Sequence, residues 1–270
     1  MNDDHAVAAA IATRAGEMLL ELRRSLAGAD PERLGAEGDR RSHAHITSLL
    51  AEARPDDPVL SEEGKDDPRR LSSERVWIVD PLDGTREYGE TRPDWAVHVA
   101  LWAHGDLVAG AVALPEAADL LRLLFDRPAY EPVDRTKVVW ATGAAAPAQP
   151  ADLPPPTGRL VVSRSRPPDF AADVGRALEL DVVALGSAGA KVMAVVLGQA
   201  DAYVHAGGQY EWDSAAPVAV ARRHGFHASR IDGSPLAYNQ PDPLLPDIVV
   251  CRPELAKPLL GATAHAAGGS

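Results

Sequence analysis

Two aspartates, a proline and a glycine are grouped in the hexapeptide 80–85, directly after an apolar run that predicts a β-strand over residues 76–79. Carboxylates at a strand end followed by Pro and Gly lie in a tight turn, so Asp80, Asp83 and the carbonyl of Leu82 can converge on one point. These are the hard oxygen ligands that Mg²⁺ requires. A lone Asp-x-x-Asp is usually turn chemistry, but the complete Asp-Pro-Leu-Asp-Gly-Thr is far rarer by chance. Its last two residues offer backbone N–H groups suited to a phosphate oxygen: Gly84 and Thr85.

Acidic residues elsewhere in the chain could complete such a site. In the Ser-Glu-Glu-Gly stretch only one of the adjacent glutamates, Glu62 and Glu63, can face the site, because neighbouring side chains at a strand end point to opposite faces. Asp213, within Glu-Trp-Asp-Ser-Ala-Ala, could bind a metal or only cap the helix that follows. Asp39 precedes a predicted helix, where an acid is more often a cap or loop residue than a ligand.

The first part of the chain predicts helices and a hairpin that can position these acids. Apolar side chains recur every three or four residues over 7–26, which indicates an amphipathic helix capped by an aspartate. Ser42 is expected to cap a second helix, which ends before Pro55. Apolar runs over 95–103 and 107–114 flank a Gly-Asp turn, which predicts two antiparallel strands.

A Pro- and Ala-rich stretch over 143–158 has no periodicity and predicts an exposed loop or linker. We place a boundary there between an N-terminal α+β half (1–145), with the Glu-Glu and Asp-Pro-Leu-Asp-Gly-Thr motifs, and a C-terminal α/β half (158–270), with the Trp-Asp motif. In the second half strands and helices alternate, as in a layered α/β unit. The expected strands are 160–163, 182–185 and 202–205, and the expected helices are 169–180, 187–197 and 213–224.

The charge balance excludes some classes of function. The 270 residues carry 27 basic and 39 acidic side chains, a formal net charge of −12. Sequence-independent nucleic-acid binding needs Lys and Arg to displace counterions, so we expect no nucleic-acid partner. An anionic substrate would have to be held by bound cations. The single cysteine excludes an intramolecular disulfide, and the absence of a long apolar run or a basic N-terminal segment favours a cytoplasmic location without a membrane span.

Together the acidic motifs resemble those of the inositol monophosphatase superfamily of Mg²⁺-dependent, lithium-sensitive phosphatases. That family has Trp-x-x-Asp-Pro-[Ile/Leu]-Asp-Gly-Thr, a preceding Glu-Glu motif and a following Trp-Asp-x-Ala-Ala, which occur here in that order at 77–85, 61–63 and 212–216. The resemblance covers nearly the whole chain and implies an α/β (α+β) fold, a layered αβαβα sandwich. It implies two or three Mg²⁺ per site, held by Glu62, Asp80, the Leu82 carbonyl, Asp83 and Asp213. Asp39 and Thr85 would join Glu62 in orienting the attacking water.

Within the superfamily the chain is most similar to the bacterial CysQ-type branch, the phosphatases of 3′-phosphoadenosine-5′-phosphate (PAP). The similarity rests on Leu-Ser-Glu-Glu, Asp-Gly-Thr-Arg-Glu, Val-Ser-Arg-Ser and a Tyr-Asn pair near the end. The chain departs from the family's pattern in the 89–94 turn, and at Trp95, where the family often has Phe. The resemblance implies the following substrate-binding residues: Gly84, Thr85, Ser163, Arg164, Gly186, Ser187, Lys191 and Glu211.

A substrate with two phosphates presents one to the metals and needs a local cation for the other. Lys191 is expected one turn into the predicted helix 187–197, where exposed N–H groups and the helix dipole already favour an anion. Arg164 and Arg166, on the loop after the 160–163 strand, could reach the same anion or could be solvated surface side chains.

The predicted reaction is hydrolysis of the 3′-phosphate of PAP to AMP and phosphate by direct attack of metal-activated water, the 3′(2′),5′-bisphosphate nucleotidase reaction of sulfur assimilation. No Cys, His or Ser nucleophile accompanies the acids, so no covalent phosphoenzyme is expected. Inositol 1-phosphate and fructose 1,6-bisphosphate are alternative substrates of the same site. The alternative of another class is a catalytically silent metal- or nucleotide-binding regulator, which is expected to have lost a ligand, whereas all the acids are present here. The expected partner is a small phosphorylated substrate, and a homodimer is compatible with this interpretation.

Overall fold

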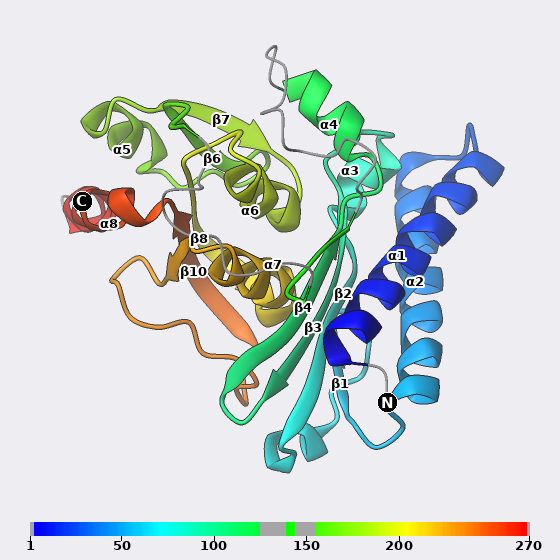
Figure 1. Ribbon diagram of the computed structural model, residues 1–270. Coiled ribbons are helices and arrows are strands. Elements are labelled where there is room, and N and C mark those ends of the chain that lie inside the picture. Colours follow the sequence, from blue (N-terminus) through cyan, green and yellow to red (C-terminus); the bar gives the residue numbers. More distant parts are fainter. Residues whose placement is uncertain (1–2, 125–138, 144–154, 269–270) are drawn as a thin grey trace.

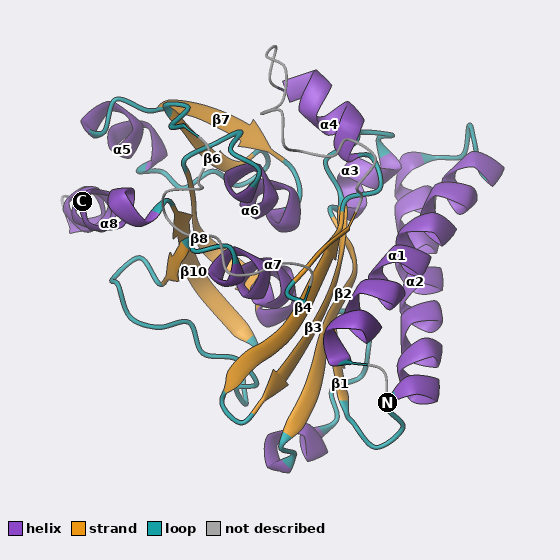
Figure 2. Ribbon diagram, in the orientation of Figure 1, coloured by secondary structure: helices purple, strands orange, loops and turns teal. Residues whose placement is uncertain are grey.

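Helices and sheets alternate in five layers (Figure 1, Figure 2). The computed structural model describes residues 3–124, 139–143 and 155–268. The layered α/β sandwich implied by the resemblance is confirmed. Most of the Pro- and Ala-rich stretch lies outside the described residues, so the division of the chain into two halves there stays a prediction. None of the described helices is both long and apolar enough to cross a bilayer.

The first sheet has the strand order β1-β2-β3-β4-β5. Its strands are β1 (Val59–Ser61), β2 (Arg75–Asp83), β3 (Ala96–Ala103), β4 (Asp106–Ala113) and β5 (Val139–Ala141). β1 pairs with β2 in parallel, and the other neighbours are antiparallel. The predicted hairpin is confirmed as β3 and β4, which turn at Gly105 with a φ of 92°.

Helices α1 (Asp4–Ser25) and α2 (Pro31–Ala53) cover one face of this sheet (Figure 1). The predicted aspartate cap of α1 is Asp3, whose side chain accepts the N–H of His5. The predicted start of the second helix at Ser42 is wrong, because Asp30 caps α2 twelve residues earlier and a proline follows at the first helical position. Ser42 is buried inside α2, and its hydroxyl donates to the carbonyl of Pro81 at 2.7 Å.

The second sheet has the strand order β7-β6-β8-β10-β9. Its strands are β6 (Arg159–Ser163), β7 (Asp181–Leu185), β8 (Ala202–Tyr210), β9 (His227–Ser229) and β10 (Leu244–Cys251). The first three strands and the helices α5 (Ala171–Ala177), α6 (Ala188–Val196) and α7 (Glu211–Arg223) were predicted, although several boundaries differ by a few residues. Strands β9 and β10 and helix α8 (Ala256–Gly268) were not predicted from the sequence. The shorter elements are η1 (Pro68–Ser72), α3 (Thr85–Gly89), α4 (Ala117–Leu124) and η3 (Pro253–Leu255).

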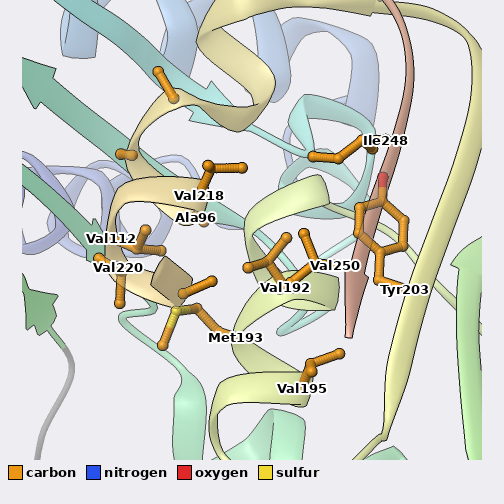
Figure 3. Close-up of a cluster of buried hydrophobic side chains, with 14 of the residues drawn as sticks. Ala96, Val112, Val192, Met193, Val195, Tyr203, Val218, Val220, Ile248 and Val250 are labelled. Carbon is orange, nitrogen blue, oxygen red and sulfur yellow. The ribbon is translucent and has the colours of Figure 1, made fainter. Parts of the chain in front are cut away.

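Three apolar clusters hold the five layers together. One lies between the sheets, where Val192 and Met193 of α6 and Val220 of α7 pack with Tyr203 and Val250 of the second sheet (Figure 3). A second packs α1 and α2 on the first sheet, and a third packs α5 and α8 on the second. Burial of apolar surface contributes roughly 25 cal/mol per Å², so these clusters fix α6 and α7 between the sheets. Both of these helices begin at the site described next.

Candidate functional site

Three carboxyl groups come together where β2 ends and α7 begins. Oxygens of Asp80, Asp83 and Asp213 lie within 4.8 Å of one another. Burial, followed by the charges of Asp83 and Glu62, raises the pKa of Asp80 well above its usual value. Burial and the charge of Asp83 raise the pKa of Asp213 to about 7. A cation between these groups would remove their repulsion, and the all-oxygen donor set fits a divalent ion such as Mg²⁺.

A β-bulge at the end of β2 places both of its aspartates in this cluster. β2 pairs with β3 at Asp80–His98 and again at Asp83–Ala96, so one extra residue lies on β2 between the two pairs. In a regular strand, residues three apart would point to opposite faces. The tight turn predicted from the sequence lies at Gly84, directly after the last residue of β2, where a φ of 88° suits glycine.

Asp83 also joins the cluster to the start of α6. Its carboxylate accepts hydrogen bonds from the hydroxyl of Ser187 at 2.5 Å and from the backbone N–H groups of Ala188 at 3.1 Å and Gly189 at 2.6 Å. Nε2 of the buried His98 lies 3.3 Å from the same carboxylate. Replacing Asp83 would therefore disturb the attachment of α6 as well as any bound ion.

Two glycines of α2 allow this helix to approach the end of β2. A Cβ added to Gly35 would lie 2.9 Å from Cγ2 of Thr85, and one added to Gly38 would lie 2.8 Å from Cδ2 of Leu82. A larger residue at either position would force the helix away. The close approach brings Asp39, one residue after the second glycine, to the site from inside a helix. The prediction that Asp39 precedes a helix is wrong, because it lies within α2.

Asp39 and Thr85 form a hydrogen-bonded pair beside the cluster. Oγ1 of Thr85 donates to Oδ2 of Asp39 at 2.8 Å and lies 3.0 Å from the Leu82 carbonyl oxygen. Oδ1 of Asp39 is buried and has no hydrogen-bond partner among the described residues. Burial, opposed by the Thr85 hydrogen bond and reinforced by the charges of Glu63 and Asp83, raises the pKa of Asp39 to about 7. The pair can accept a hydrogen bond from water, and Asp39 can take up a proton near neutral pH.

We expect Thr85→Ala to lower kcat ten- to hundredfold, because the alanine removes the hydroxyl that holds Asp39 in place. Thr85→Ser keeps this hydroxyl and is the matched control, expected to retain most of the wild-type kcat. Steady-state kinetics of the two variants and the wild type, at saturating metal, measures the difference. Equal activity of the alanine and serine variants would show that the hydroxyl has no part in the reaction.

Glu62 reaches the same site from the turn after β1. β1 lies beside β2 with Ser61 opposite Val79, so the residue that follows comes to the same end of the sheet as Asp80. Of the two adjacent glutamates, Glu62 lines the cavity that holds the acidic cluster, while Glu63 lines a neighbouring depression. Desolvation in the cleft, and then the charge of Asp39, raises the pKa of Glu62 to about 7.

The raised pKa values predict that a divalent cation bound by these carboxylates, Mg²⁺ in the test below, stabilises the protein more at higher pH. Asp39, Glu62 and Asp213 have pKa values of about 7 in the metal-free fold, so they hold protons at pH 5.0 and are mostly ionised at pH 7.5. Mg²⁺ must displace those protons at pH 5.0, which weakens its binding there. We expect 10 mM Mg²⁺ to raise the melting temperature by at least about 3 °C more at pH 7.5 than at pH 5.0. Equal shifts at the two pH values would contradict binding to these carboxylates.

The cavity beside the acids has a volume of about 220 Å³. Both carboxylates and hydroxyl-bearing residues line it, which suits a phosphate held between cations and hydrogen-bond donors. The predicted site residues that line it are Glu62, Asp80, Leu82, Asp83, Gly84, Thr85, Ser163, Gly186, Ser187, Lys191 and Asp213. Asp39 contacts the cavity through its hydrogen bond with Thr85.

Two predicted substrate-binding residues do not line this cavity. The guanidinium of Arg164 pairs with Glu87 at 2.7 Å and Glu90 at 2.9 Å. The carboxylate of Glu211 accepts the backbone N–H groups of Asn239 at 2.6 Å and of the next residue at 2.7 Å. Both side chains connect parts of the fold that surround the site. A residue next to a site residue in the sequence can therefore point away from the site.

Lys191 lies at the cavity with its ammonium turned toward its own helix. Nζ donates to the carbonyl oxygens of Gly186 and Ser187, the latter at 2.9 Å, and lies 5.3 Å from the centre of the Tyr203 ring. Burial lowers its pKa to about 8. These contacts already use two of its three N–H donors. The expected binding of a second phosphate by Lys191 stays a prediction.

Two polar residues of β8 line the cavity and were missed by the sequence analysis, which ended this strand at residue 205. Nε2 of His205 lies 2.8 Å from the carbonyl oxygen of Gly207 and so carries the proton, while Gln209 donates to the hydroxyl of Tyr203 at 2.8 Å. Nδ1 of His205 and Oε1 of Gln209 are buried, and neither has a hydrogen-bond partner in the described chain. Both are acceptors, so they suit hydroxyl or amine groups of a ligand.

Comparisons with known proteins support the family resemblance and the fold. The model of the "Inositol monophosphatase family" matches residues 2–267. The chain is 49% identical over 261 residues to "3'-phosphoadenosine 5'-phosphate phosphatase" from Mycobacterium leprae, covering 96% of this chain and 92% of that protein. It is 32% identical over 207 residues to the Escherichia coli K12 "3'(2'),5'-bisphosphate nucleotidase CysQ", covering 74% and 77% of the two chains.

Solved structures of other proteins have the same fold. CysQ from Bacteroides thetaiotaomicron superposes with a TM-score of 0.70 at 25% identity, covering 92% of this chain and 97% of that one. An inositol monophosphatase from Staphylococcus aureus superposes with a TM-score of 0.71 at 20% identity, covering 93% and 92%. The second likeness concerns the fold alone.

Proposed function

Because the chain belongs to the inositol monophosphatase family and is therefore a phosphatase, we propose that its substrate is PAP, from which it removes the 3′-phosphate to give AMP. The proposal rests above all on 49% identity over 96% of the chain to a protein named as a PAP phosphatase. The convergence of three carboxylates beside a 220 Å³ cavity independently supports metal-dependent phosphatase chemistry at this site. This reaction would belong to sulfur metabolism.

The acidic cluster would hold the metal ions. We propose Asp80, Asp83, Asp213, Glu62 and the Leu82 carbonyl as ligands, because these groups face one cavity and offer hard oxygen donors. Bound Mg²⁺ supplies positive charge at the phosphate and lowers the pKa of water. Without such charge the same carboxylates would repel the substrate.

Asp39 and Thr85 would orient the attacking water. The Thr85 hydroxyl donates to Oδ2 of Asp39, which leaves the Thr85 oxygen lone pair and Oδ1 of Asp39 as acceptors for the water's two hydrogens. With a pKa of about 7, Asp39 can accept one of these protons as the water attacks phosphorus. Gly84 and Thr85 line the cavity, and their backbone N–H groups would bind the phosphate oxygens, because those at the start of α6 already donate to Asp83 and to neighbouring groups.

No covalent intermediate is needed in this reaction. The one cysteine, Cys251, is buried in β10 and does not line the cavity, and burial raises the pKa of its thiol to about 12. Among the serines that line the cavity, Ser187 donates its hydroxyl to Asp83 and accepts the N–H of Ala190. Direct attack by water therefore remains the proposed route. The homodimer and the cytoplasmic location stay predictions.

Phosphate release measured across a substrate panel tests the proposal. The purified protein would be assayed with Mg²⁺ on PAP, inositol 1-phosphate and fructose 1,6-bisphosphate. We expect kcat/KM to be highest for PAP, by at least about tenfold over inositol 1-phosphate, which lacks a second phosphate and so loses one charged contact. A preference for either sugar phosphate would reject PAP as the main substrate, and no release from any of the three would favour a catalytically silent protein.

A further inference from the structure

Three cationic side chains line the cavity in the part of the chain that the structure describes: Arg86, Arg166 and Lys191. Arg86 pairs with Glu90 at 2.8 Å. Lys191 is fully buried and donates to two carbonyl groups of its own helix start. Arg166 is exposed, and no carboxylate of the described residues lies within ion-pair distance of it. Among the described residues, Arg166 is therefore the exposed cation at the cavity that has no carboxylate partner.

A glycine pair at the end of β8 makes room for this arginine. Gly207 and Gly208 have φ angles of 87° and 75°, which other residues rarely adopt. A Cβ added to Gly208 would lie 2.9 Å from Nη1 of Arg166, and the same nitrogen donates to the Gly208 carbonyl at 3.3 Å. At its other end, the backbone N–H of Arg166 donates to Oγ of Ser163 at 3.2 Å. The guanidinium is thus seated against the backbone of a neighbouring strand.

The seated guanidinium keeps most of its donors for a ligand. Guanidinium has five N–H groups in one plane, and the Gly208 carbonyl accepts from one of them. The planar arrangement suits two oxygens of one phosphate at once. The charge of Arg166 also acts on His205, another cavity residue, whose pKa is lowered first by burial and then by the charges of Lys191 and Arg166. Arg166 and the acidic cluster both line this cavity, the first as a site for an anion and the second as a site for cations.

We propose that Arg166 binds the phosphate of the substrate that is not cleaved, the 5′-phosphate of PAP, and that it is the residue that makes the site selective for bisphosphorylated nucleotides. The inference rests on the proposed function, since it assigns the second anion of that substrate. A protein with a net charge of −12 must meet a remote anion with a local cation. Arg164 is paired with two glutamates, and Lys191 is turned toward its helix.

Comparing PAP with adenosine 3′-monophosphate tests this assignment, because the two substrates share the reacting phosphate and differ only in the 5′-phosphate. We expect Arg166→Ala to raise KM for PAP about tenfold and to change KM for adenosine 3′-monophosphate less than about twofold, with kcat unchanged on both. Arg166→Lys, which keeps the charge and loses the planar donors, should fall between wild type and alanine. Arg176→Ala is the matched control, since this arginine lies on α5, 77% exposed and paired with Asp173.

The outcomes separate this inference from the proposed function. If the wild type hydrolyses PAP but Arg166→Ala raises both KM values equally, or neither, Arg166 does not bind the second phosphate and the inference is wrong while the function stands. If Lys191→Ala produces the selective loss and Arg166→Ala does not, the second phosphate belongs to Lys191, as first expected. If the wild type does not turn over PAP, the proposed function fails and the inference fails with it.

Discussion

Removing divalent metal with EDTA is expected to abolish phosphate release from PAP, and adding Mg²⁺ back is expected to restore it. The reason is electrostatic. Asp80, Asp83 and Asp213 offer oxygens within 4.8 Å of one another, so in the absence of cations they repel each other and any phosphate that approaches. Activity should fall by a factor of about 10³ or more, since both charge neutralisation and activation of water are lost. A phosphate-release assay on metal-stripped protein measures this directly.

Lithium provides an independent check on the same site. Li⁺ is a small hard cation that competes for oxygen ligands, so we expect it to inhibit turnover in the presence of Mg²⁺. Na⁺ at the same concentration is the control for ionic strength. Undiminished activity in EDTA would contradict a metal-dependent mechanism, whatever the effect of lithium.

The second large effect is expected for Asp213→Asn, which should lower kcat by a factor on the order of 10² or more. The asparagine keeps an oxygen that can accept the N–H of Tyr210, a bond of 2.6 Å at the start of α7, so the helix cap remains. It removes one negative charge from a group whose pKa burial and Asp83 raise to about 7. The metal-free variant should therefore melt no lower than the wild type at pH 7.5.

Asp83→Asn and Asp173→Asn are informative companions to this variant. Asp83→Asn should lose activity and also melt at a lower temperature, because Asp83 accepts three hydrogen bonds from the start of α6. Asp173→Asn changes an exposed carboxylate on α5 and should leave both properties unchanged. If the folded Asp213→Asn variant has the kcat of the wild type, Asp213 only caps the helix and has no part in the reaction.

The site could be predicted best from the sequence where acidic motifs lie on elements with a strong periodic pattern. The acids around Asp80 and Asp213 stand in motifs whose order along the chain resembles one family, and the strands and helices that carry them have strong periodic patterns. The convergence of Asp80, Asp83 and Leu82 on one cavity was therefore predictable. So was the choice of a single glutamate from the adjacent pair, although which of the two faces the cavity needed the three-dimensional fold.

Other features depended on contacts between distant segments. The α2 helix continues through two glycines because it packs closely on Thr85 and Leu82. Glycine disfavours a helix locally, and local propensity does not include the stabilisation that this packing provides. Arg164 pairs with Glu87, 77 residues earlier in the chain. That Arg164 does not line the cavity could therefore not be predicted from its sequence neighbours. The contact of Arg166 with the Gly208 carbonyl likewise requires β6 and β8 to lie side by side.

The most direct test of the account is the identity of the nucleotide formed from PAP, determined by chromatography against 5′-AMP and 3′-AMP standards with and without Mg²⁺. We expect 5′-AMP and inorganic phosphate in equal amounts when Mg²⁺ is present, and neither product when the metal has been removed. Formation of 3′-AMP, or of any AMP at the same rate in metal-free solution, would contradict it.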